Sequence, residues 1–323
     1  MSCSGCPAVS NLPAPGELLT LREPRFGRPY LLYVPSRYRE DRRWPLVVTC
    51  HGTRPADTAG LQMKEWKGLG EMRGFLVAAP ELTAASALTP GAPEQIRRQL
   101  DDEQAILSML SAIKAARSID DAQVFITGWS AGCYVALFAG LRHPEVFRGI
   151  SLRQGNFNPA FVEPCIPFLD QNQPIQVTSA ELDLLRDEAK RCLDWLRMHG
   201  LDPTPLEQFS GHRRGPEPVF AFFADVIRNR PWARIEVHED AADDQRVTFS
   251  VRASFAPVAF LWDFGDGERS DQPAPTHRYA HPGLYSVRAA LWLGGNRRVV
   301  RQVQLQVPRV RLGATPPATG PGR

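Results

Sequence analysis

A serine flanked by glycines is the feature of this sequence that most directly indicates chemistry. It lies in VFITGWSAGCYVALFAG, residues 124–140, where an apolar run precedes Gly128-Trp129-Ser130-Ala131-Gly132 and a helix-like pattern follows. The spacing G-x-S-x-G at a strand-to-helix turn exposes a serine hydroxyl at the end of a strand. An ordinary turn also accepts these residues, so the prediction that Ser130 is a nucleophile depends on finding its partners.

The first partner is a carboxylate, because a serine hydroxyl needs a base and the base needs an acid to orient it. Where a G-x-S-x-G serine lies between a strand and a helix of an α/β sheet, the acid follows the serine along the chain, after a later strand. Three acidic residues, Glu181, Asp183 and Asp187, follow the strand-like PIQVTS at 174–179. We predict Asp183 as the acid because it precedes the helical pattern; Glu181 is the alternative, and Asp187 belongs to the helix.

The second partner is a histidine after the next strand. His212 directly follows Gly211 at the end of the strand-like PLEQFS, residues 205–210, and a new helix begins near Pro216. A histidine in such a loop has no obvious packing role. We therefore predict His212 as the general base.

The oxyanion of an acyl-transfer intermediate needs two backbone N–H groups. Ala131, the residue after the nucleophile, supplies one. The other is expected from the loop HGTRPADTAG that follows the strand-like PLVVTC, with Thr53 as the donor and Arg54 as the alternative. His51 at the start of this loop is expected to hold it by a hydrogen bond rather than to act as an acid or base.

These residues must be positioned by a sheet. From about Leu18 to Arg228, short apolar runs alternate with helical patterns, which predicts an α/β domain with a mostly parallel sheet and helices on both faces. Strands are predicted at 30–34, 45–50, 74–79, 123–128, 147–152, 174–179 and 205–210, and helices at 95–117, 131–142, 184–199 and 216–228.

The C-terminal part has a different rhythm. From Ala233 the residues alternate between apolar and polar, turns recur and no helical pattern is found, which predicts an all-β, immunoglobulin-like sandwich. We therefore predict four segments along the chain: a flexible N-terminal segment at 1–17, the α/β domain at 18–230, the sandwich at 233–309 and a disordered tail at 312–323.

Five short motifs follow one another in a fixed order between residues 20 and 228. They read YLLYVPSRY (30–38), PLVVTCHGT (45–53), TGWSAGC (127–133), SAELD (179–183) and SGH (210–212). In this set the chain resembles the α/β-hydrolase esterases of the polyhydroxybutyrate depolymerase and feruloyl esterase type. The resemblance implies a Ser130–Asp183–His212 triad, Thr53 and Ala131 as oxyanion donors, and no metal or organic cofactor. The acid loop departs from the family's H-G-x-x-D.

Two further motifs, FLWDFGDGERS (260–270) and PTHRYAHPGLYSVRAAL (275–291), resemble those of PKD domains. Such modules act as spacers or in contacts with polysaccharides, polymers or proteins, mostly outside the cell. Asp266-Gly267 is expected to form a hairpin turn, with Asp263 and Asp266 as turn and hydrogen-bonding residues.

Charge and cysteine usage bound the remaining alternatives. The formal net charge is +3 and no Lys/Arg block forms a basic stripe, which argues against a nucleic-acid partner.

The N-terminus shows no secretory signal as written, although Ser4-Gly5-Cys6 resembles the start of a mature bacterial lipoprotein. The PKD-like domain favours export or the cell envelope, and the missing signal favours the cytoplasm. In an exported protein, Cys165 and Cys192 could form a disulfide; Cys3 and Cys6 lack the second pair of a zinc site.

We therefore expect a serine carboxylesterase that acts on a small-molecule or polymeric ester, such as a polyhydroxyalkanoate or a feruloyl or acyl-carbohydrate ester. The alternatives are a non-catalytic surface or polymer-binding protein on a hydrolase scaffold, and a serine peptidase of the same fold. Only about 20 residues separate the predicted strands at 147–152 and 174–179, so no large lid is expected. Phe157, Phe161 and Phe168 in that segment either line a substrate pocket or pack in the core.

Overall fold

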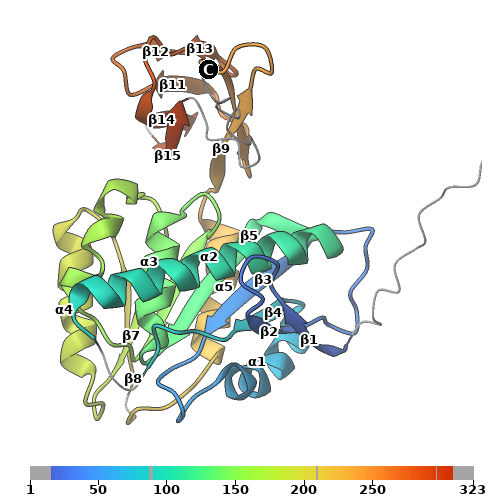
Figure 1. Ribbon diagram of the computed structural model, residues 1–323, viewed down its shortest axis with the longest axis vertical. Coiled ribbons are helices and arrows are strands. Elements are labelled where there is room, and N and C mark those ends of the chain that lie inside the picture. Colours follow the sequence, from blue (N-terminus) through green and yellow to red (C-terminus); the bar gives the residue numbers. More distant parts are fainter. Residues whose placement is uncertain (1–15, 87–89, 209, 296, 308–323) are drawn as a thin grey trace, which may run out of the picture. The chain divides into compact units, whose positions relative to one another are not determined.

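The computed structural model describes residues 16–86, 90–208, 210–295 and 297–307 of the 323-residue chain (Figure 1). The cysteine pair Cys3 and Cys6, the lipoprotein-like start and the C-terminal tail from 312 lie outside these residues. The chain divides into two compact units, Met1–Arg230 and Pro231–Arg323. Each is described by itself.

The first unit is built on one eight-stranded sheet with the order β1-β2-β4-β3-β5-β6-β7-β8. β1 pairs with β2, and β2 with β4, in antiparallel fashion, whereas all pairs from β4 through β3 to β8 are parallel. The strands are β1 Leu18–Arg22, β2 Pro29–Tyr33, β3 Trp44–Cys50, β4 Leu76–Pro80, β5 Ile119–Trp129, β6 Gly149–Arg153, β7 Ile175–Ala180 and β8 Thr204–Gln208.

Helices cover both faces of this sheet. The α-helices are α1 Ala59–Arg73, α2 Ala92–Ala116, α3 Gly132–Arg142, α4 Arg186–Met198 and α5 Glu217–Asn229, and two short 3-10 helices span Pro159–Phe161 and Glu163–Phe168. Along β3, Leu46 and Val48 belong to the core cluster that includes residues of α2, α3 and α4, whereas Val47 belongs to the cluster that includes residues of α1 and α5. Continuous apolar strands are what a parallel sheet buried on both faces requires.

The sequence-based prediction missed β1 and α1. Three glycines at 60, 68 and 70 obscure the helical pattern of α1, since glycine disfavours helices. The helix nevertheless has a proper start, where the Thr58 side chain accepts from Leu61 N, and a left-handed end at Gly74. Gly70 has a packing reason: a Cβ there would lie 2.8 Å from Val77 Cγ2, so the glycine lets the helix approach β4.

The end of the first unit is fastened to the sheet by one arginine. The Arg148 guanidinium donates to Ala122 O near the start of β5 at 3.0 Å. It also donates to Val226 O at 2.9 Å and to Arg230 O at 3.0 Å, at the end of α5. These carbonyls lie at the amino ends of the parallel strands, because β5 runs from here toward Ser130.

The second unit consists of two antiparallel sheets, one with the order β13-β10-β9 and one with the order β12-β11-β14-β15. Trp262, Phe249 and Tyr279 are fully buried in its core. Asp263 accepts from Gly265 N and Asp266 from Glu268 N, which are the turn contacts expected of them. The strands are β9 Ala233–Glu239, β10 Arg246–Ala253, β11 Ala259–Asp263, β12 Arg269–Ser270, β13 Thr276–Arg278, β14 Gly283–Gly294 and β15 Arg297–Val307.

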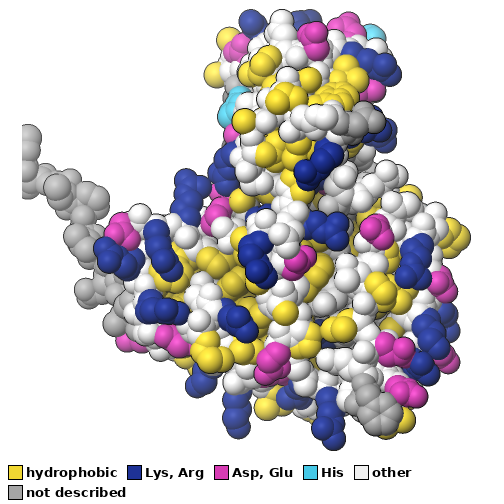
Figure 2. All heavy atoms as spheres, turned by 180° about the vertical axis from the view of Figure 1, so that it is seen from behind, with side chains coloured by type: hydrophobic (Ala, Val, Ile, Leu, Met, Phe, Trp, Pro, Cys, Tyr) yellow, Lys and Arg dark blue, Asp and Glu magenta, His cyan; other side chains and the backbone are white. Residues whose placement is uncertain are grey.

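The charge distribution and the lengths of the helices bear on nucleic-acid binding and on membrane spanning. On the face that Figure 2 shows, Lys and Arg side chains are interspersed with Asp and Glu side chains and with apolar groups. Within the described ranges, no helix combines the length and the apolar character needed to cross a membrane.

Candidate active site

Ser130 lies on a tight turn between β5 and α3. Its backbone has a φ of 52°, in the left-handed region that non-glycine residues rarely adopt. Ser130 N donates to Arg153 O at 3.1 Å, and Ser130 O accepts from Cys133 N and Asn156 N. The turn is therefore held both by the helix that follows it and by the loop after β6.

The glycines of the motif are required by packing. A Cβ on Gly128 would lie 2.4 Å from Gly132 O, and a Cβ on Gly132 would lie 2.4 Å from both Cys50 O and His51 O. The first glycine lets α3 begin directly against β5, and the second lets α3 approach the end of β3. The spacing G-x-S-x-G thus reflects how closely three backbone segments converge beneath Ser130.

Asp183 and His212 are hydrogen-bonded to each other. His212 Nδ1 lies 3.0 Å from Asp183 Oδ2 and 3.1 Å from Oδ1, and Asp183 also accepts from Leu185 N. Asp183 is buried, whereas Glu181 is exposed and Asp187 lies on α4 near Lys190. Of the three acidic candidates, the structure brings Asp183 to the histidine. With Nδ1 donating to the carboxylate, Nε2 of the neutral imidazole is an acceptor.

Trp129 connects His212 to the serine turn. Its indole stacks on the His212 ring with centroids 4.7 Å apart, and the Arg214 guanidinium lies 4.8 Å from its ring centre. Since Trp129 directly precedes Ser130, this stacking places the histidine beside the serine turn. No hydrogen bond joins Ser130 to His212 among the described residues; such bonds are often long before substrate binds.

The loop after β3 presents a free N–H group next to Ser130. A Cβ on Gly52 would lie 2.8 Å from the Trp129 ring and 3.2 Å from Ser130 Cβ, so this loop packs directly on the serine. Arg54 N donates to Ala85 O, whereas Thr53 N and Ala131 N have no hydrogen-bond partner in the described part of the chain. Thr53 is therefore the available donor of the two candidates in this loop.

His51 orients that N–H group. The imidazole is fully buried; its Nε2 accepts from Leu82 N at 2.9 Å, which leaves Nδ1 as the donor to Gly52 O at 2.8 Å. In a trans peptide the C=O and N–H point in opposite directions. Fixing Gly52 O on one side directs Thr53 N to the other, so His51 has the loop-holding contact that the sequence led us to expect.

Asp57 joins this loop to the histidine loop, and the sequence analysis did not single it out. Its buried carboxylate accepts from Gly52 N at 2.7 Å and from Gln62 Nε2 at 2.6 Å, and it pairs with Arg214 at 3.1 Å. The available signal was an acidic residue in the loop after an apolar strand. Because Arg214 follows His212 by two residues, one carboxylate connects both loops and α1.

A second buried ion pair lies next to this network. Arg153 is fully buried, with Nη1 3.1 Å from Glu65 Oε1 and Nη2 donating to Gln62 Oε1 at 2.7 Å. Burial lowers the pKa of Arg153 and raises the pKa of Glu65, and the attraction between the two charges opposes both shifts. Gln62 bonds both Asp57 and Arg153, so the end of β6 and the loop after β3 share one polar network.

Several residues that the sequence analysis singled out have packing roles. Phe157 and Phe161 are buried, beside Trp195 and Tyr134, and Arg142 lies over Phe168. The disulfide suggested for Cys165 and Cys192 is not formed: both are free, buried thiols. Cys165 Sγ instead lies 3.7 Å from Phe138 O, beneath α3.

Within the described ranges, no group of three or more His, Cys, Asp or Glu side chains could hold a metal ion.

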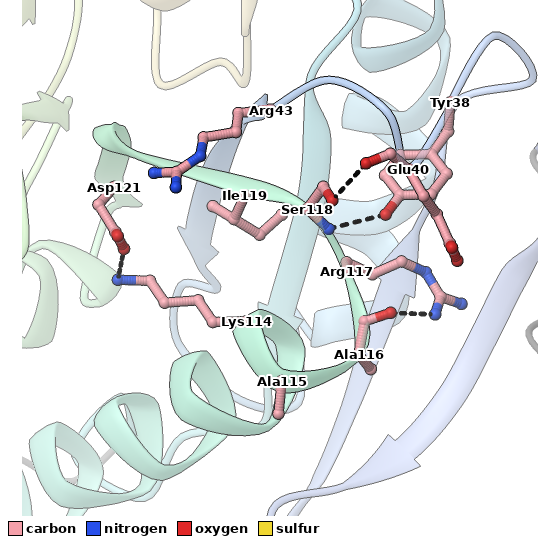
Figure 3. Close-up of a pocket in the computed structure, with 10 residues that line it drawn as sticks. All are labelled: Tyr38, Glu40, Arg43, Lys114, Ala115, Ala116, Arg117, Ser118, Ile119 and Asp121. Atoms are coloured by element: carbon pink, nitrogen blue, oxygen red, sulfur yellow. Dashed lines mark hydrogen bonds and ion pairs between the residues drawn. The ribbon is translucent and has the colours of Figure 1, made fainter. Parts of the chain in front are cut away.

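A surface cleft opens where α2 ends and β5 begins, at the other end of β5 from Ser130 (Figure 3). Lys114 in this cleft pairs with Asp121, and Arg117 donates to Ala116 O. Ligands of open α/β sheets bind outside the carboxyl ends of the strands, so we do not assign the active site to this cleft. It is lined by Tyr38, Glu40, Arg43, Lys114, Ala115, Ala116, Arg117, Ser118, Ile119 and Asp121.

Comparison with known proteins agrees with both units. A PKD domain model matches residues 228–294. Poly(3-hydroxyalkanoate) depolymerase C of Paucimonas lemoignei is 30% identical over 109 residues, which cover 32% of this chain and 26% of the depolymerase. The chain thus spans only about a quarter of the length of that relative.

Solved structures show the fold of the first unit. An esterase of Rhizomucor miehei superposes with a TM-score of 0.51 at 16% identity, covering 68% of this chain and 85% of the esterase. A ferulic acid esterase of Anaeromyces mucronatus gives 0.52 at 13% identity, covering 64% and 87%. The predicted fold class is confirmed: the first unit has the α/β-hydrolase fold of these structures, and the second unit is matched by the PKD domain model.

Proposed function

We propose that this protein is a serine carboxylic ester hydrolase with Ser130 as nucleophile, His212 as general base and Asp183 as the acid that orients it. The observation that most supports this is the Asp183–His212 pair stacked on Trp129, the residue before a serine held in the left-handed turn. Thr53 N and Ala131 N, which have no hydrogen-bond partner among the residues that the structure describes, are the proposed oxyanion donors.

The reaction proceeds in two steps. Ser130 Oγ attacks the ester carbonyl carbon while His212 Nε2 takes its proton, and the negative charge on the carbonyl oxygen is stabilised by the two N–H groups. The C–O bond to the alcohol then breaks, and His212 returns the proton to the leaving oxygen. In the second step, His212 takes a proton from water while the water oxygen attacks the acyl carbon. The bond from this carbon to Ser130 Oγ then breaks, His212 returns the proton to Oγ, and the acid is released.

The substrate is proposed to be an ester of a hydroxyalkanoate polymer or a feruloyl or acyl-carbohydrate ester. The depolymerase relative supports the former, and the second unit offers a module of a kind that contacts polymers. No step of this mechanism uses a metal or organic cofactor.

Labelling with a fluorophosphonate probe, followed by peptide mass spectrometry, tests the proposal. We expect an adduct on Ser130 that is lost in His212→Ala and kept in His199→Ala, whose histidine lies at the end of α4. On an ester substrate, Ser130→Ala should lower kcat by roughly 10⁴-fold or more.

The outcomes separate the alternatives. A folded wild-type protein that is not labelled contradicts the proposal and favours a non-catalytic polymer-binding protein. A labelled protein that cleaves peptides faster than any ester of a panel favours a serine peptidase.

A further inference from the structure

Gln154 is a buried residue at the carboxyl end of β6 that the mechanism above does not use. It directly follows the strand, is 2% exposed, and has a φ of 46° in the left-handed region. Its backbone N donates to Thr178 O at 3.0 Å, which continues the pairing of β6 with β7 by one residue. The backbone of Gln154 is thus fixed at the carboxyl end of β6.

The side chain of Gln154 hydrogen-bonds both peptide groups that flank His212. Its Nε2 donates to Gly211 O at 3.2 Å, and its Oε1 accepts from Arg213 N at 2.6 Å. Gly211 O belongs to the peptide before His212 and Arg213 N to the peptide after it. One amide therefore restrains the backbone on both sides of the histidine, whereas Asp183 and Trp129 restrain its ring.

An amide matches the chemistry of the two partners. Gly211 O needs a donor and Arg213 N needs an acceptor, and the side chains of Asn and Gln offer both side by side on one planar, uncharged group. Asparagine is one methylene shorter and would not reach from the same Cα. The left-handed backbone disfavours Gln relative to Asn or Gly, so its side-chain contacts offset a local conformational cost.

We propose that Gln154 is a positioning residue for His212, holding the backbone of residues 211–213 so that the imidazole meets the Ser130 hydroxyl. This inference rests on the proposed function. The loop that Gln154 holds lies between β8 and α5, and its residues 210–216 belong to no helix or strand. Without the amide, the histidine would keep its contact with Asp183 but sample other positions relative to Ser130.

Three substitutions test this role. Gln154→Met keeps the size and loses both hydrogen bonds. Gln154→Asn suits the left-handed backbone but does not reach the loop, so it removes the contact without straining the fold. Gln154→Glu keeps the acceptor for Arg213 N, replaces the donor to Gly211 O, and adds a negative charge near His212.

Gln173→Met is the matched control. Gln173 is also buried and uses its Nε2 to donate to two carbonyls, Gly140 O and Phe147 O, away from the histidine loop. Losing its amide tests the general cost of removing a buried glutamine. Thermal unfolding of each variant reports whether it is folded.

We expect Gln154→Met and Gln154→Asn to lower kcat on an ester by about 10- to 100-fold with KM little changed, the size of loss that a displacement near 1 Å produces. The rate of fluorophosphonate labelling at Ser130 should fall in parallel. Gln154→Glu should also raise the apparent pKa in the pH profile of kcat/KM, because its added negative charge lies near His212. A fall in kcat with KM unchanged, in a variant that unfolds like wild type, is the readout that a purely structural role would not give. Gln173→Met should keep the wild-type kcat per labelled site.

The results distinguish this inference from the proposal on which it rests. If wild type is labelled at Ser130, His212→Ala is not, and a folded Gln154→Asn is labelled at the wild-type rate, the positioning role is overturned and the ester hydrolase stands. A wild type that is never labelled overturns both.

Discussion

Trp129 and His212 stack with their ring centroids 4.7 Å apart and their planes inclined by 29°. Trp129 is the variable residue between the first glycine and the serine of the motif, and His212 comes from a loop more than 80 residues later. The stacking therefore connects the two groups that must exchange a proton in the proposed mechanism. It is a contact that neither the serine motif nor the histidine loop reveals alone.

The first prediction concerns this pair. Trp129→Leu removes the stacking surface, so the His212 ring should become less well placed and kcat should fall by about 10- to 100-fold. The matched control is Trp195→Leu, because the Trp195 ring lies 4.1 Å from the ring of His199, at the end of α4, with their planes tilted by 34°. Steady-state kinetics on a soluble ester should show a larger loss of kcat in Trp129→Leu; equal losses would contradict the role of this pair.

The second prediction concerns the link between the two site loops. Arg214→Met leaves the buried Asp57 carboxylate without its ion-pair partner, although three N–H groups still bond it. The free energy of unfolding should fall by roughly 1–3 kcal/mol. Because Asp57 holds Gly52 N, kcat should fall as well.

Urea unfolding and kinetics check this second prediction against Arg186→Met. The Arg186–Glu207 pair is largely exposed, so its loss should cost under about 1 kcal/mol. An Arg214→Met variant as stable and active as Arg186→Met would refute the link.

The third prediction concerns pH and a cluster away from the site. Burial alone would lower the pKa of His143, but its hydrogen bonds to Glu103 and Glu145 outweigh burial and raise that pKa to about 9. The folded state therefore holds this proton more tightly than the unfolded chain, whose histidine titrates near pH 6.5. The resulting stabilisation is complete below about pH 6.5 and is lost as the pH rises toward 9.

Urea unfolding at several pH values measures this effect. The free energy of unfolding should fall by roughly 1–3 kcal/mol between pH 6.5 and 9. In His143→Gln the slope over this window should be smaller. An unchanged slope would show that His143 does not titrate as stated.

The fourth prediction concerns the glycines. Gly132→Ala places a Cβ against two backbone oxygens that cannot move away, and we expect the variant to be destabilised by more than about 3 kcal/mol or insoluble. Gly68→Ala is the control: it lies on exposed α1 surface with nothing within 4 Å of the added Cβ. It should be neutral or stabilise by up to about 1 kcal/mol. Thermal melts compare the two.

The sequence predicted the centre of the sheet well because β3 and the second half of β5 are mainly apolar runs that are recognisable without any tertiary information. It missed α1, whose glycines are explained only by the approach of Gly70 to Val77 on β4. The sequence predicted this strand at 123–128, whereas β5 begins at Ile119. Ile119 pairs with Trp44, and a register shift follows before Val124 pairs with Leu46.

The candidate site shows the same limit. Ser130, Asp183, His212 and Thr53 could be proposed because each follows a recognisable strand and belongs to a residue type with known chemistry. Asp57, Arg214 and Gln154 could not, because their roles depend on loops from different strands meeting in space. Among Asp183 and Glu181, burial and the hydrogen bond to His212 separate two residues that the sequence could only rank.

The arginine clamp at the end of α5 has a mechanical consequence. Arg148 ties the chain at Val226 and Arg230 to the start of β5, at the edge of the sheet opposite Ser130. A force that pulls on the chain at Pro231 enters the first unit at Arg230. Arg148 would pass that load into the start of β5, at the amino ends of the parallel strands, rather than into the loops around Ser130 and His212.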